Sequence, residues 1–374
     1  MATATAALHA RRIGEICADG WACLLRRVDT LTLAAMPKHN RNTHAHVVIG
    51  VDLGGTKILA AVVDAKGHVL GTGKKSTHAE KGPEAVIQRI EKAMDEALED
   101  AEIDKSQIAA IGVGAPGVVD NAHGLVISLP NLPGWDRVPL SKALRHWHDV
   151  PVTLTNDVRA AAIGEHRFGA GKGTHSMVAV FIGTGIGGGI VLNDRVWEGF
   201  RGSAGEIGHI VTLADGPYAP GSGTRGGIEA LASRSAIERE IRAALREGRR
   251  SIIPELLQEK ESTTITSGIL AKALKKGDAL TIEVLERATH YLGLHAASLI
   301  NAFDPEVLVY GGGVIEALGE WMLPRIEALA RQHAINKHQI ERVKIAPAKL
   351  GDRAGVVGAA MFAFDALEGM AQPT

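Results

Sequence analysis

Short runs of Val, Ile and Leu, separated by glycine turns, open the main body of the chain. Residues 46–71, HVVIGVDLGGTKILAAVVDAKGHVLG, alternate such runs with GG and KG turns, and so predict strand, turn, strand, turn and strand. Residues 82–101 carry apolar side chains at helical spacing behind Pro83, which suits a first helical turn, and they predict a helix. Two buried strands are predicted next, in IAAIGVGAPGVVD (108–120) and VPVTLTND (150–157).

The same pattern starts again in the middle of the chain. Residues 177–199, MVAVFIGTGIGGGIVLNDRVWEG, predict strand, glycine loop, strand, Asn-Asp turn and strand. Helical patterns follow at about 228–247 and 278–302. The remaining elements are a strand, glycine cluster and helix in PEVLVYGGGVIEA (305–317), a strand in RVKIAPA (342–348) and a closing helix over 352–368.

A hairpin that carries a glycine loop therefore occurs twice, near 47–63 and near 177–192, each time ahead of further strands and helices. Weak similarity between IGVDLGGTKILAAVV and VFIGTGIGGGIVLN agrees with a duplication. We therefore predict two α/β halves that face one another across a cleft.

Composition and charge narrow the range of partners. The 374 residues carry a net charge of −1, which gives no electrostatic reason to expect nucleic acid or an anionic membrane as a partner. No stretch reaches the roughly 18 consecutive apolar residues that a membrane helix needs. The two cysteines, Cys17 and Cys23, both precede residue 47, so the main body has no disulfide framework and a reducing, cytoplasmic setting is favoured.

Residues 1–46 differ from the rest of the chain. They combine arginine pairs with an Ala-rich pattern and the polar tract PKHNRNTHAH. A transit peptide is one interpretation, but Glu15, Asp19 and Asp29 count against an acid-poor presequence. We expect a disordered extension, or a true start at Met36.

The first glycine loop, DLGGTK, has the groups that could hold a phosphorylated ligand. Gly54 and Gly55 let the backbone come close and leave N–H groups free for phosphate oxygens. Thr56 and Lys57 add a hydroxyl and a cation, and Asp52 can face a hydrated Mg²⁺. A plain hairpin turn is the alternative interpretation of the same residues.

The second loop, GTGIGGG, matches G-x-G-x-x-G through Gly183, Gly185 and Gly188. A dinucleotide-binding loop opens a helix, whereas GIVLND follows here and predicts strand and turn, so the NAD interpretation is disfavoured. No segment matches the P-loop pattern G-x-x-x-x-G-K-[ST]. The two hairpins indicate a nucleotide held between two lobes, together with a third cluster at Gly311, Gly312 and Gly313.

Asn156 and Asp157 lie where a predicted strand ends and a small-residue helix begins. Phosphoryl transfer to an alcohol needs a base within hydrogen-bond reach of the attacking hydroxyl, and Asp serves in that role. The alternative is that Asp157 only caps the helix, and the local sequence leaves both open.

Glu206, His209 and Glu229 lie in EIGHIVTLADGPYAPGSGTRGGIEALAS (206–233). Gly205 and Gly208 make a helix unlikely at Glu-x-x-His, which disfavours a helical metal pair. Without a second Glu-x-x-His, a di-iron bundle is excluded. The two carboxylates and the imidazole are suited instead to hydrogen bonds with the vicinal hydroxyls of a sugar.

Taken in order, the motifs of this chain resemble those of one family. They are DLGGTK, GAPGVVD, PNLPGW, NDVRAAAIGEHRFGAG, GTGIGGGIVLNDRVWEGFRGSAGEIGH, GIEALAS, GGGV and GDRAGVVGAA. Together they resemble the ROK family (repressors, open reading frames and sugar kinases), and in particular its bacterial glucokinases. The resemblance runs from about Val47 to Phe364.

The resemblance implies an actin-like ATPase fold, ribonuclease H-like, with ATP between two lobes. We expect the small lobe at 47–165 together with 352–374, and the large lobe at 166–351. By family likeness, Asp157 is the base for the sugar 6-hydroxyl, and the sugar-binding residues are Gly117, Asn156, Asp157, Glu206, His209 and Glu229. The phosphates and the nucleotide would lie against Asp52, Gly54, Gly55, Thr56, Lys57, Gly183, Thr184, Gly185, Gly311, Gly312 and Gly313, with Mg²⁺.

Two departures from the family pattern stand out. Zinc-binding members carry C-x-C-G-x-x-G-C-x-E after the Glu-x-x-His, where Pro220, Ser222 and Gly227 replace the three cysteines here. Proline and glycine offer no side-chain ligand and a neutral serine is a poor one, so no structural zinc is expected. Arg159 stands where many relatives carry Asn, and the sequence assigns it no function.

The leading prediction is an ATP-dependent hexose kinase, with a hexose and ATP as its small-molecule partners. Among hexose kinases, a glucokinase is favoured. We expect a cytoplasmic homodimer or homotetramer without nucleic-acid or membrane partners. The alternatives are an N-acetylhexosamine kinase, a fructokinase, a polyphosphate-using glucokinase, and a sugar-responsive repressor. A repressor would carry a winged helix-turn-helix of about 60 to 80 residues ahead of the sugar domain, and the extension here is shorter.

Overall fold

The computed structural model describes residues 47–129, 132–219 and 223–371. The chain divides into Met1–His44 and Ala45–Thr374, and every described residue belongs to the second unit. The predictions for residues 1–46 and for the last three residues of the chain therefore lie outside the described residues.

The predicted opening strands form one sheet with two later strands. In spatial order this first sheet contains β3 (Val69–Ser76), β2 (Lys57–Asp64), β1 (Val47–Leu53), β4 (Ile108–Ala115) and β8 (Val152–Asn156). β1 pairs antiparallel with β2 and parallel with β4, and β4 pairs parallel with β8. The strands consist of the Val, Ile and Leu runs, whose side chains fit a pleated and buried surface.

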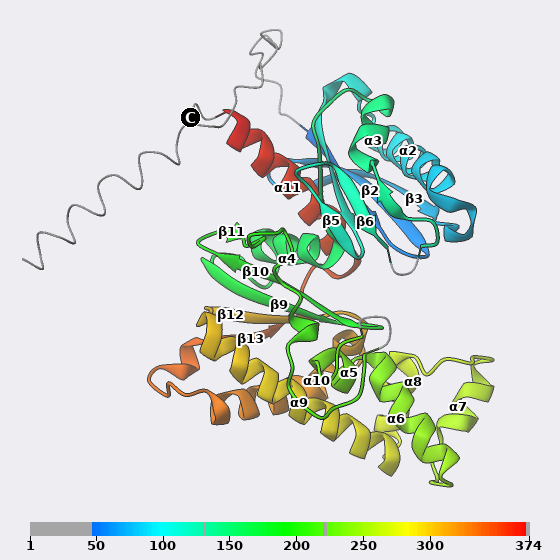
Figure 1. The fold of residues 1–374 in the computed structure, drawn as a ribbon, viewed down its shortest axis with the longest axis vertical. Coiled ribbons are helices and arrows are strands. Elements are labelled where there is room, and N and C mark those ends of the chain that lie inside the picture. The colour runs from blue at the N-terminus through cyan, green and yellow to red at the C-terminus, as the bar shows by residue number, and fades with distance from the viewer. Residues whose placement is uncertain (1–46, 130–131, 220–222, 372–374) are drawn as a thin grey trace, which may run out of the picture. The chain divides into compact units, whose positions relative to one another are not determined.

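The second half of the chain repeats this arrangement. Its sheet contains, in spatial order, β11 (Arg195–Val196), β10 (Ile186–Leu192), β9 (Ser176–Ile182), β12 (Val307–Gly311) and β13 (Lys344–Pro347). β9 pairs antiparallel with β10 and parallel with β12, just as β1 pairs with β2 and β4. The predicted duplication is thus confirmed strand by strand, and Figure 1 shows the two sheets in blue-green and in green-orange.

The predicted helices are present, one of them divided in two, and the helices at residues 140–147, 253–259 and 267–275 were not predicted. The helices are α2 (Gly82–Ala101), α3 (Leu140–Trp147), α4 (Asp157–Phe168), α5 (Ile228–Ala232), α6 (Arg234–Arg246), α7 (Ile253–Glu259), α8 (Ser267–Lys275), α9 (Ala279–Phe303), α10 (Gly313–His333) and α11 (Ala354–Ala371). The single helix predicted over 228–247 was wrong, because Ser233 is extended and its side chain accepts a hydrogen bond from Ala236 N–H. Ser233 is therefore the N-cap of a new helix, which begins at Arg234.

Shorter elements complete the described residues. A three-stranded antiparallel sheet, β5 (Val118–Asp120), β6 (Leu125–Ser128) and β7 (Asp136–Val138), was not predicted because its strands are too short to show a period. Single 3₁₀ turns occur at η1 (Ala79–Lys81), η2 (Lys105–Gln107), η3 (Ile207–His209), η4 (Ile340–Arg342) and η5 (Gly351–Arg353).

Helices α4 and α11 join the two halves. α11 packs against β1 and β4, where a Cβ on Gly50 or Gly112 would overlap the backbone of α11. α4 packs against β10, where Gly187 and Gly189 leave room for its side chains. The two helices also pack on one another, as Figure 1 shows in green and red. The lobe boundaries at residues 165 and 351 stay a prediction.

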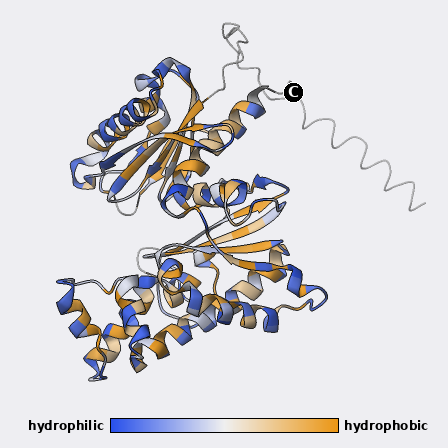
Figure 2. Cartoon of the chain, turned by 180° about the vertical axis from the view of Figure 1, so that it is seen from behind, coloured by the Kyte–Doolittle hydropathy of each residue, from blue (hydrophilic) through white to orange (hydrophobic). Residues whose placement is uncertain are grey.

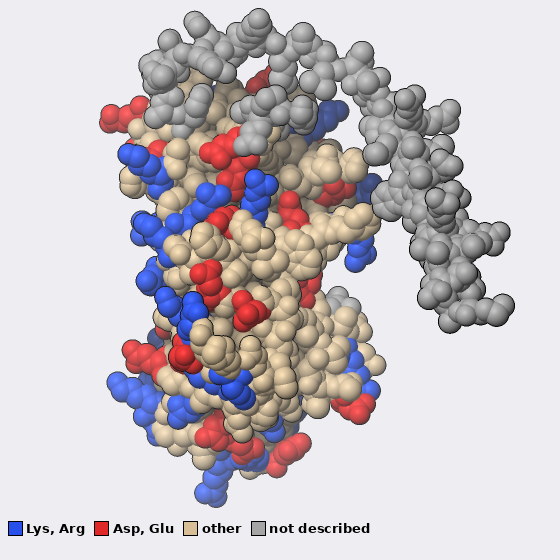
Figure 3. All heavy atoms as spheres, turned by 90° about the vertical axis from the view of Figure 1, so that its left-hand side faces the viewer, with Lys and Arg blue, Asp and Glu red and all other residues tan. Residues whose placement is uncertain are grey.

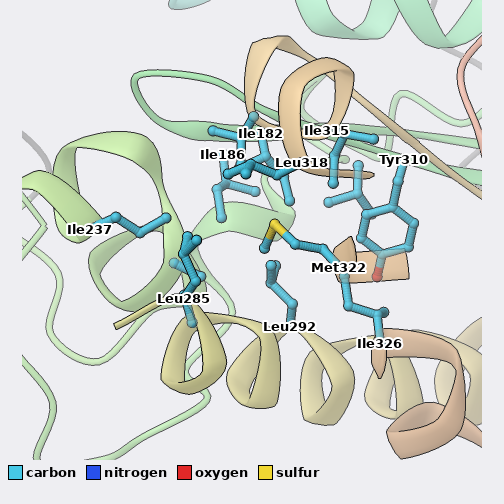
Figure 4. Packing of buried hydrophobic residues seen from close by; sticks show 14 of the residues in the cluster. Ile182, Ile186, Ile237, Leu285, Leu292, Tyr310, Ile315, Leu318, Met322 and Ile326 are labelled. Atoms are coloured by element: carbon cyan, nitrogen blue, oxygen red, sulfur yellow. The ribbon is translucent and has the colours of Figure 1, made fainter. Parts of the chain in front are cut away.

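The largest apolar core lies between the second sheet and its helices. Figure 4 shows Ile182 and Tyr310 from the strands facing Leu292 of α9 and Met322 of α10, all buried. The strands of both sheets are predominantly hydrophobic in Figure 2. On the face drawn in Figure 3, positive and negative side chains are interspersed.

Candidate functional site

Asp157 lies at the junction that the sequence predicted, between the end of β8 and the first turn of α4. Asn156 is the N-cap of that helix, and its side chain accepts hydrogen bonds from Val158 N–H and Arg159 N–H at 3.0 and 3.2 Å. The Asn156 amide donates to Gly117 O at 3.2 Å. Asn156 therefore does the capping. The Asp157 carboxylate accepts one bond from Val158 N–H, at 2.9 Å, and keeps acceptor capacity for another group.

A cavity of about 400 Å³ brings together predicted residues from three parts of the chain. It is lined by Asp52 and Lys57 of the first hairpin, Asp157 of α4, and Gly312 and Gly313 at the start of α10. These residues are far apart in sequence, so only the fold unites them. The parallel strands β1, β4 and β8 end at the same edge, where ligands bind in open α/β sheets.

The electrostatics of this cavity are dominated by two carboxylates. Burial, followed by the charge of Asp157, raises the pKa of Asp52 from 3.8 to about 7, while Lys57 opposes the increase. Burial also raises the pKa of Asp157, Glu206 adds to that increase, and the Val158 N–H hydrogen bond opposes it. The site therefore holds acidic groups whose proton affinity lies above the ordinary range, which suits proton transfer.

Asp352, in η5, belongs to this cavity although the sequence assigned it no role. Its carboxylate pairs with the Lys57 ammonium at 2.5 Å, and this bond lowers the pKa of Asp352. Gly355 also lines the cavity, and a Cβ there would lie 2.9 Å from an Asp52 carboxylate oxygen. The motif GDRAGVVGAA contained both residues, but the sequence could not show that it returns to the first hairpin.

The first glycine loop is a tight hairpin turn. Gly54 N–H donates to Lys57 O at 2.9 Å, and the buried Thr77 hydroxyl donates to Gly54 O at 2.6 Å. Gly55 and Thr56 form the tip of the turn, where Thr56 is exposed. DLGGTK therefore forms a hairpin turn, and Asp52 and Lys57 line the same cavity as Asp157. Phosphate binding by this turn stays a prediction.

The second glycine loop closes on α6. Gly183 N–H donates to Gly185 O at 2.9 Å, and Arg234 holds the loop through its own N–H to Gly183 O at 3.0 Å and its guanidinium to the Thr184 hydroxyl at 3.2 Å. Of these loop residues, none lines the cavity around Asp157. Further along this hairpin, on β10, Gly188 makes room for Ile207 of the Glu206–His209 turn.

The third glycine cluster starts a long helix. Gly311 ends β12, Gly312 is the N-cap with φ 83°, and Gly313 is the first residue of α10. This N-cap has no side-chain hydrogen bond, so the first N–H groups of a 21-residue helix point out of its end. An uncapped helix N-terminus attracts phosphate groups.

Glu206, His209 and Glu229 come together around η3 and the start of α5. Glu206 is exposed and His209 partly so, and the His209 Nδ1 lies 3.3 Å from the Thr224 hydroxyl. The Glu229 carboxylate accepts Ile186 N–H at 2.8 Å and so ties α5 to the second hairpin. Residues 206–209 form a single 3₁₀ turn, which confirms that the Glu-x-x-His pair does not lie on an α-helix.

The loop between His209 and Glu229 is organised by backbone contacts. Bridges join Val211 to Gly227 and Tyr218 to Arg225, and the Arg225 guanidinium donates to Gly216 O at 2.7 Å and Asp215 O at 3.0 Å. Two of the three positions that replace the zinc cysteines, Pro220 and Ser222, lie outside the described residues. Across the parts of the chain that are described, no group of three or more His, Cys, Asp or Glu side chains could hold a metal ion.

With this geometry in place, comparison with known proteins identifies the family. The family match covers residues 48–366, nearly all of the main body, and its description is "ROK family". The chain belongs to the ROK family. Its membership confirms the resemblance that the ordered motifs indicated.

Curated relatives and solved structures agree with this assignment. The ROK protein described here is 33% identical to the glucokinase of Halalkalibacterium halodurans over 310 residues, which cover 83% of this chain and 92% of the relative. It is 34% identical to the ROK hexokinase of Thermus thermophilus, with a TM-score of 0.74 over 86% of this chain and 99% of the other. The structure of a Streptomyces griseus ROK glucokinase with glucose and AMPPNP gives 34% identity and a TM-score of 0.71, over 85% of this chain and 99% of the other.

These neighbours confirm the predicted fold class of the ROK protein, an actin-like, ribonuclease H-like α/β fold. The roles of the individual site residues stay predictions. Among the helices of the described residues, none is both long enough and apolar enough to cross a membrane.

Proposed function

We propose that this ROK protein is an ATP-dependent hexose kinase that phosphorylates glucose, with Asp157 as the general base. The observation that carries the proposal is the cavity that joins Asp157 to the first hairpin and to the N-terminus of α10. The identity of about a third to proteins named glucokinase or hexokinase, over more than four fifths of this chain, supports the same activity.

Asp157 takes the proton from the attacking sugar hydroxyl. Its carboxylate is fixed by Val158 N–H and lies beside Asn156, whose amide is itself held by Gly117 O. The raised pKa of Asp157 brings its proton affinity closer to the working pH than an ordinary carboxylate's. As the hydroxyl oxygen attacks the γ-phosphorus in line, its proton passes to Asp157 and the bond to the β-phosphate oxygen breaks.

The sugar binds between Asn156 and the Glu206–His209 turn. Glu206, His209, Glu229 and the backbone at Gly117 provide acceptors and donors for vicinal hydroxyls, and Glu206 acts on Asp157 electrostatically across this space. Since the Glu229 carboxylate already accepts Ile186 N–H, only part of its acceptor capacity is left for a sugar hydroxyl.

The phosphates lie along the opposite side of the cavity. The N–H groups at Gly312 and Gly313, the backbone at Gly55, and the Lys57 ammonium offer positive charge to the transferred group. Gly54 N–H already donates to Lys57 O at 2.9 Å, so the expectation of a free N–H at Gly54 was wrong, and this glycine shapes the turn instead. Gly183, Thr184 and Gly185 of the second hairpin, and Gly311, support the nucleotide from the other sheet. Lys57 pairs with Asp352, so a triphosphate would compete with that carboxylate for its ammonium group.

The residues fit a magnesium ion. Mg²⁺ binds through one or two carboxylates together with phosphate oxygens and water. Asp52 and Asp157 face one cavity. Burial, followed by the charge of Asp157, raises the pKa of Asp52, and a bound cation would favour its ionised form. Asp52 would hold the ion, and Mg²⁺ supplies charge neutralisation on the phosphates when bound.

The remaining properties rest on the sequence. We propose a cytoplasmic homodimer or homotetramer without a structural zinc. The loop that zinc-binding members brace with metal is held in this chain by Arg225 and the bridges around it.

A coupled assay with a panel of sugars and donors tests the function. Glucose with ATP should give the highest kcat/KM among glucose, mannose, fructose, N-acetylglucosamine and N-acetylmannosamine, each with ATP and with polyphosphate. A strong preference for another sugar or donor would move the assignment to the corresponding alternative. Absence of phosphoryl transfer to every sugar, combined with sequence-specific DNA binding by the full chain, would replace the kinase with a repressor.

A further inference from the structure

Arg159 is a buried cation in the first turn of α4, two residues after Asp157. Its side chain is about 5% exposed. Taking a guanidinium out of water costs several kcal/mol unless its N–H groups are satisfied, so its partners explain why it is tolerated. Arg159 does not line the cavity that contains Asp52, Lys57 and Asp157, so it is not one of the groups facing the phosphates.

The guanidinium contacts three residues of one segment, residues 197–206. We call this segment the connecting loop because it joins β11 to η3. The Nη2 group donates to Gly202 O and to Ala204 O, both at 2.9 Å, and Nη1 lies 3.5 Å from the Glu198 carboxylate. A planar guanidinium can reach two carbonyls and a carboxylate at once, which an ammonium cannot do with the same geometry.

Apart from Arg159, the connecting loop is attached at its start, where Trp197 N–H donates to Ile190 O at 2.8 Å and the Trp197 ring lies edge-on to Phe303. Gly199, Gly202 and Gly205 have φ of 72°, 67° and 94°, so glycines set its course and give it large conformational freedom when it is released. Phe200 is fully exposed and does not hold the loop by burial, and Trp197 at the start of the loop is only partly buried. Within the loop, Ala204 N–H donates to Glu198 O at 2.9 Å, which closes a turn without attaching it to α4.

The connecting loop ends at Glu206, the carboxylate that acts electrostatically on Asp157. Burial lowers the pKa of Arg159, and Glu198 and Glu206 oppose that change, which places Glu206 within electrostatic reach of the guanidinium as well. The same helical turn therefore carries Asp157 and holds the segment that delivers Glu206.

We infer that Arg159 is a positioning residue that latches the connecting loop to α4 and so fixes Glu206 at the correct distance from Asp157. This inference rests on the proposed function, because it concerns how the sugar is held. It acts on the sugar side of the site alone, since the phosphate-side residues belong to other segments. The Arg159 side chain itself touches neither substrate.

The test compares Arg159→Ala and Arg159→Lys with wild type, and uses Arg167→Ala as a matched control. Arg167 lies on the same helix and forms an exposed pair with Asp365 at 2.7 Å. Loss of charged hydrogen bonds of this kind should raise the glucose KM about 10- to 100-fold in Arg159→Ala and less in Arg159→Lys. The ATP KM should change by less than about twofold in both, and Arg167→Ala should match wild type.

Two further readouts separate positioning from simple stabilisation. Added methylguanidinium should lower the glucose KM of Arg159→Ala towards the wild-type value and leave Arg159→Lys unaffected. Hydrogen–deuterium exchange should be faster at residues 198–206 in Arg159→Ala, with α2 and α10 unchanged. The exchange measurement does not depend on any enzymatic activity, so it tests the latch even if the sugar-kinase assignment fails.

An unchanged glucose KM, or equal increases in the KM values for glucose and ATP, would overturn the inference. Failure of both Arg159 variants to fold would overturn it too, because Arg159 would then stabilise the whole domain. Unchanged exchange in the connecting loop would show that other contacts hold it.

Discussion

Replacing His295 with Gln should weaken the dependence of stability on acid pH. His295 lies in α9 with no exposed surface, and its Nε2 is 3.2 Å from Ile207 O in the turn that carries Glu206 and His209. Its Nδ1 has no partner among the described residues. Burial lowers the pKa of His295 from 6.5 to about 4, and the hydrogen bond to Ile207 only partly offsets it.

The sign and size of the effect follow from these two values. Below pH 6.5 the unfolded chain binds a proton at His295 that the folded chain refuses until about pH 4, so the free energy of unfolding falls as the pH falls through that window. The difference, 6.5 − 4 or about 2.5, corresponds to about 3 kcal/mol at 1.36 kcal/mol for each whole pKa unit. Above pH 6.5 His295 is neutral in both the folded and the unfolded chain, so it no longer lowers the free energy of unfolding.

Urea unfolding of wild type and His295→Gln at about pH 7, 6, 5 and 4 measures the effect. Other groups titrate in the same window, so the informative quantity is the difference between the two proteins. The stability advantage of wild type over the variant should fall by about 3 kcal/mol from pH 7 to pH 4. A glutamine amide can still donate to Ile207 O, so this bond need not be lost.

His175→Gln is the control, because its shift has the opposite sign. The hydrogen bond to Asp194 raises the pKa of the exposed His175, so its contribution is present below the unfolded pKa and is lost as the pH rises through the folded pKa. The amount by which the free energy of unfolding of wild type exceeds that of His175→Gln should therefore increase towards acid pH. If the free energies of unfolding of wild type and His295→Gln changed in parallel between pH 7 and pH 4, His295 would not be a buried, neutral imidazole.

Three further outcomes are expected. Asp157→Asn should lower kcat about 10²- to 10⁴-fold with little change in the glucose Kd from calorimetry, and near-normal turnover would remove Asp157 as the base. Gly112→Ala should lower the free energy of unfolding by about 1–3 kcal/mol, since its Cβ would overlap Ala359 O. Gly268→Ala, on α8, should raise it by about 0.5–1 kcal/mol, because the added Cβ would make only an ordinary contact, at 3.9 Å from the Thr266 hydroxyl; similar urea midpoints for the two variants would contradict this. Elemental analysis of purified protein should find no stoichiometric zinc, because Gly227 and its neighbours supply no ligand, and one tightly held zinc per chain would contradict it.

Local chemistry decided the hairpins, the helix start at Asn156 and the N-terminus of α10. Each depends on neighbouring residues: alternating Val and Ile runs, an Asn before a helical pattern, and a glycine cluster after a strand. These features could be predicted because their hydrogen bonds close within a few residues. The ordered motifs then identified the family, which the sequence alone made recognisable.

The roles of single glycines were decided by distant segments. In GTGIGGG, Gly187 and Gly189 face α4 and Gly188 faces Ile207, because successive residues of a strand point to opposite faces. In the sequence only Gly188 of these three belonged to the G-x-G-x-x-G match, and the atoms that require all three residues to be small could not be known.

Charged groups show the same division. The sequence offered Asp52, Asp157 and Lys57 as separate candidates, and only the folded sheets placed them in one cavity and brought Asp352 to Lys57. Arg159 had no assignable function in sequence, since its partners lie 39 to 45 residues away. The residue type determines which functional group a side chain carries. Its pKa and its partners depend on burial and on the neighbours that the fold brings to it, so only the tertiary structure decides them.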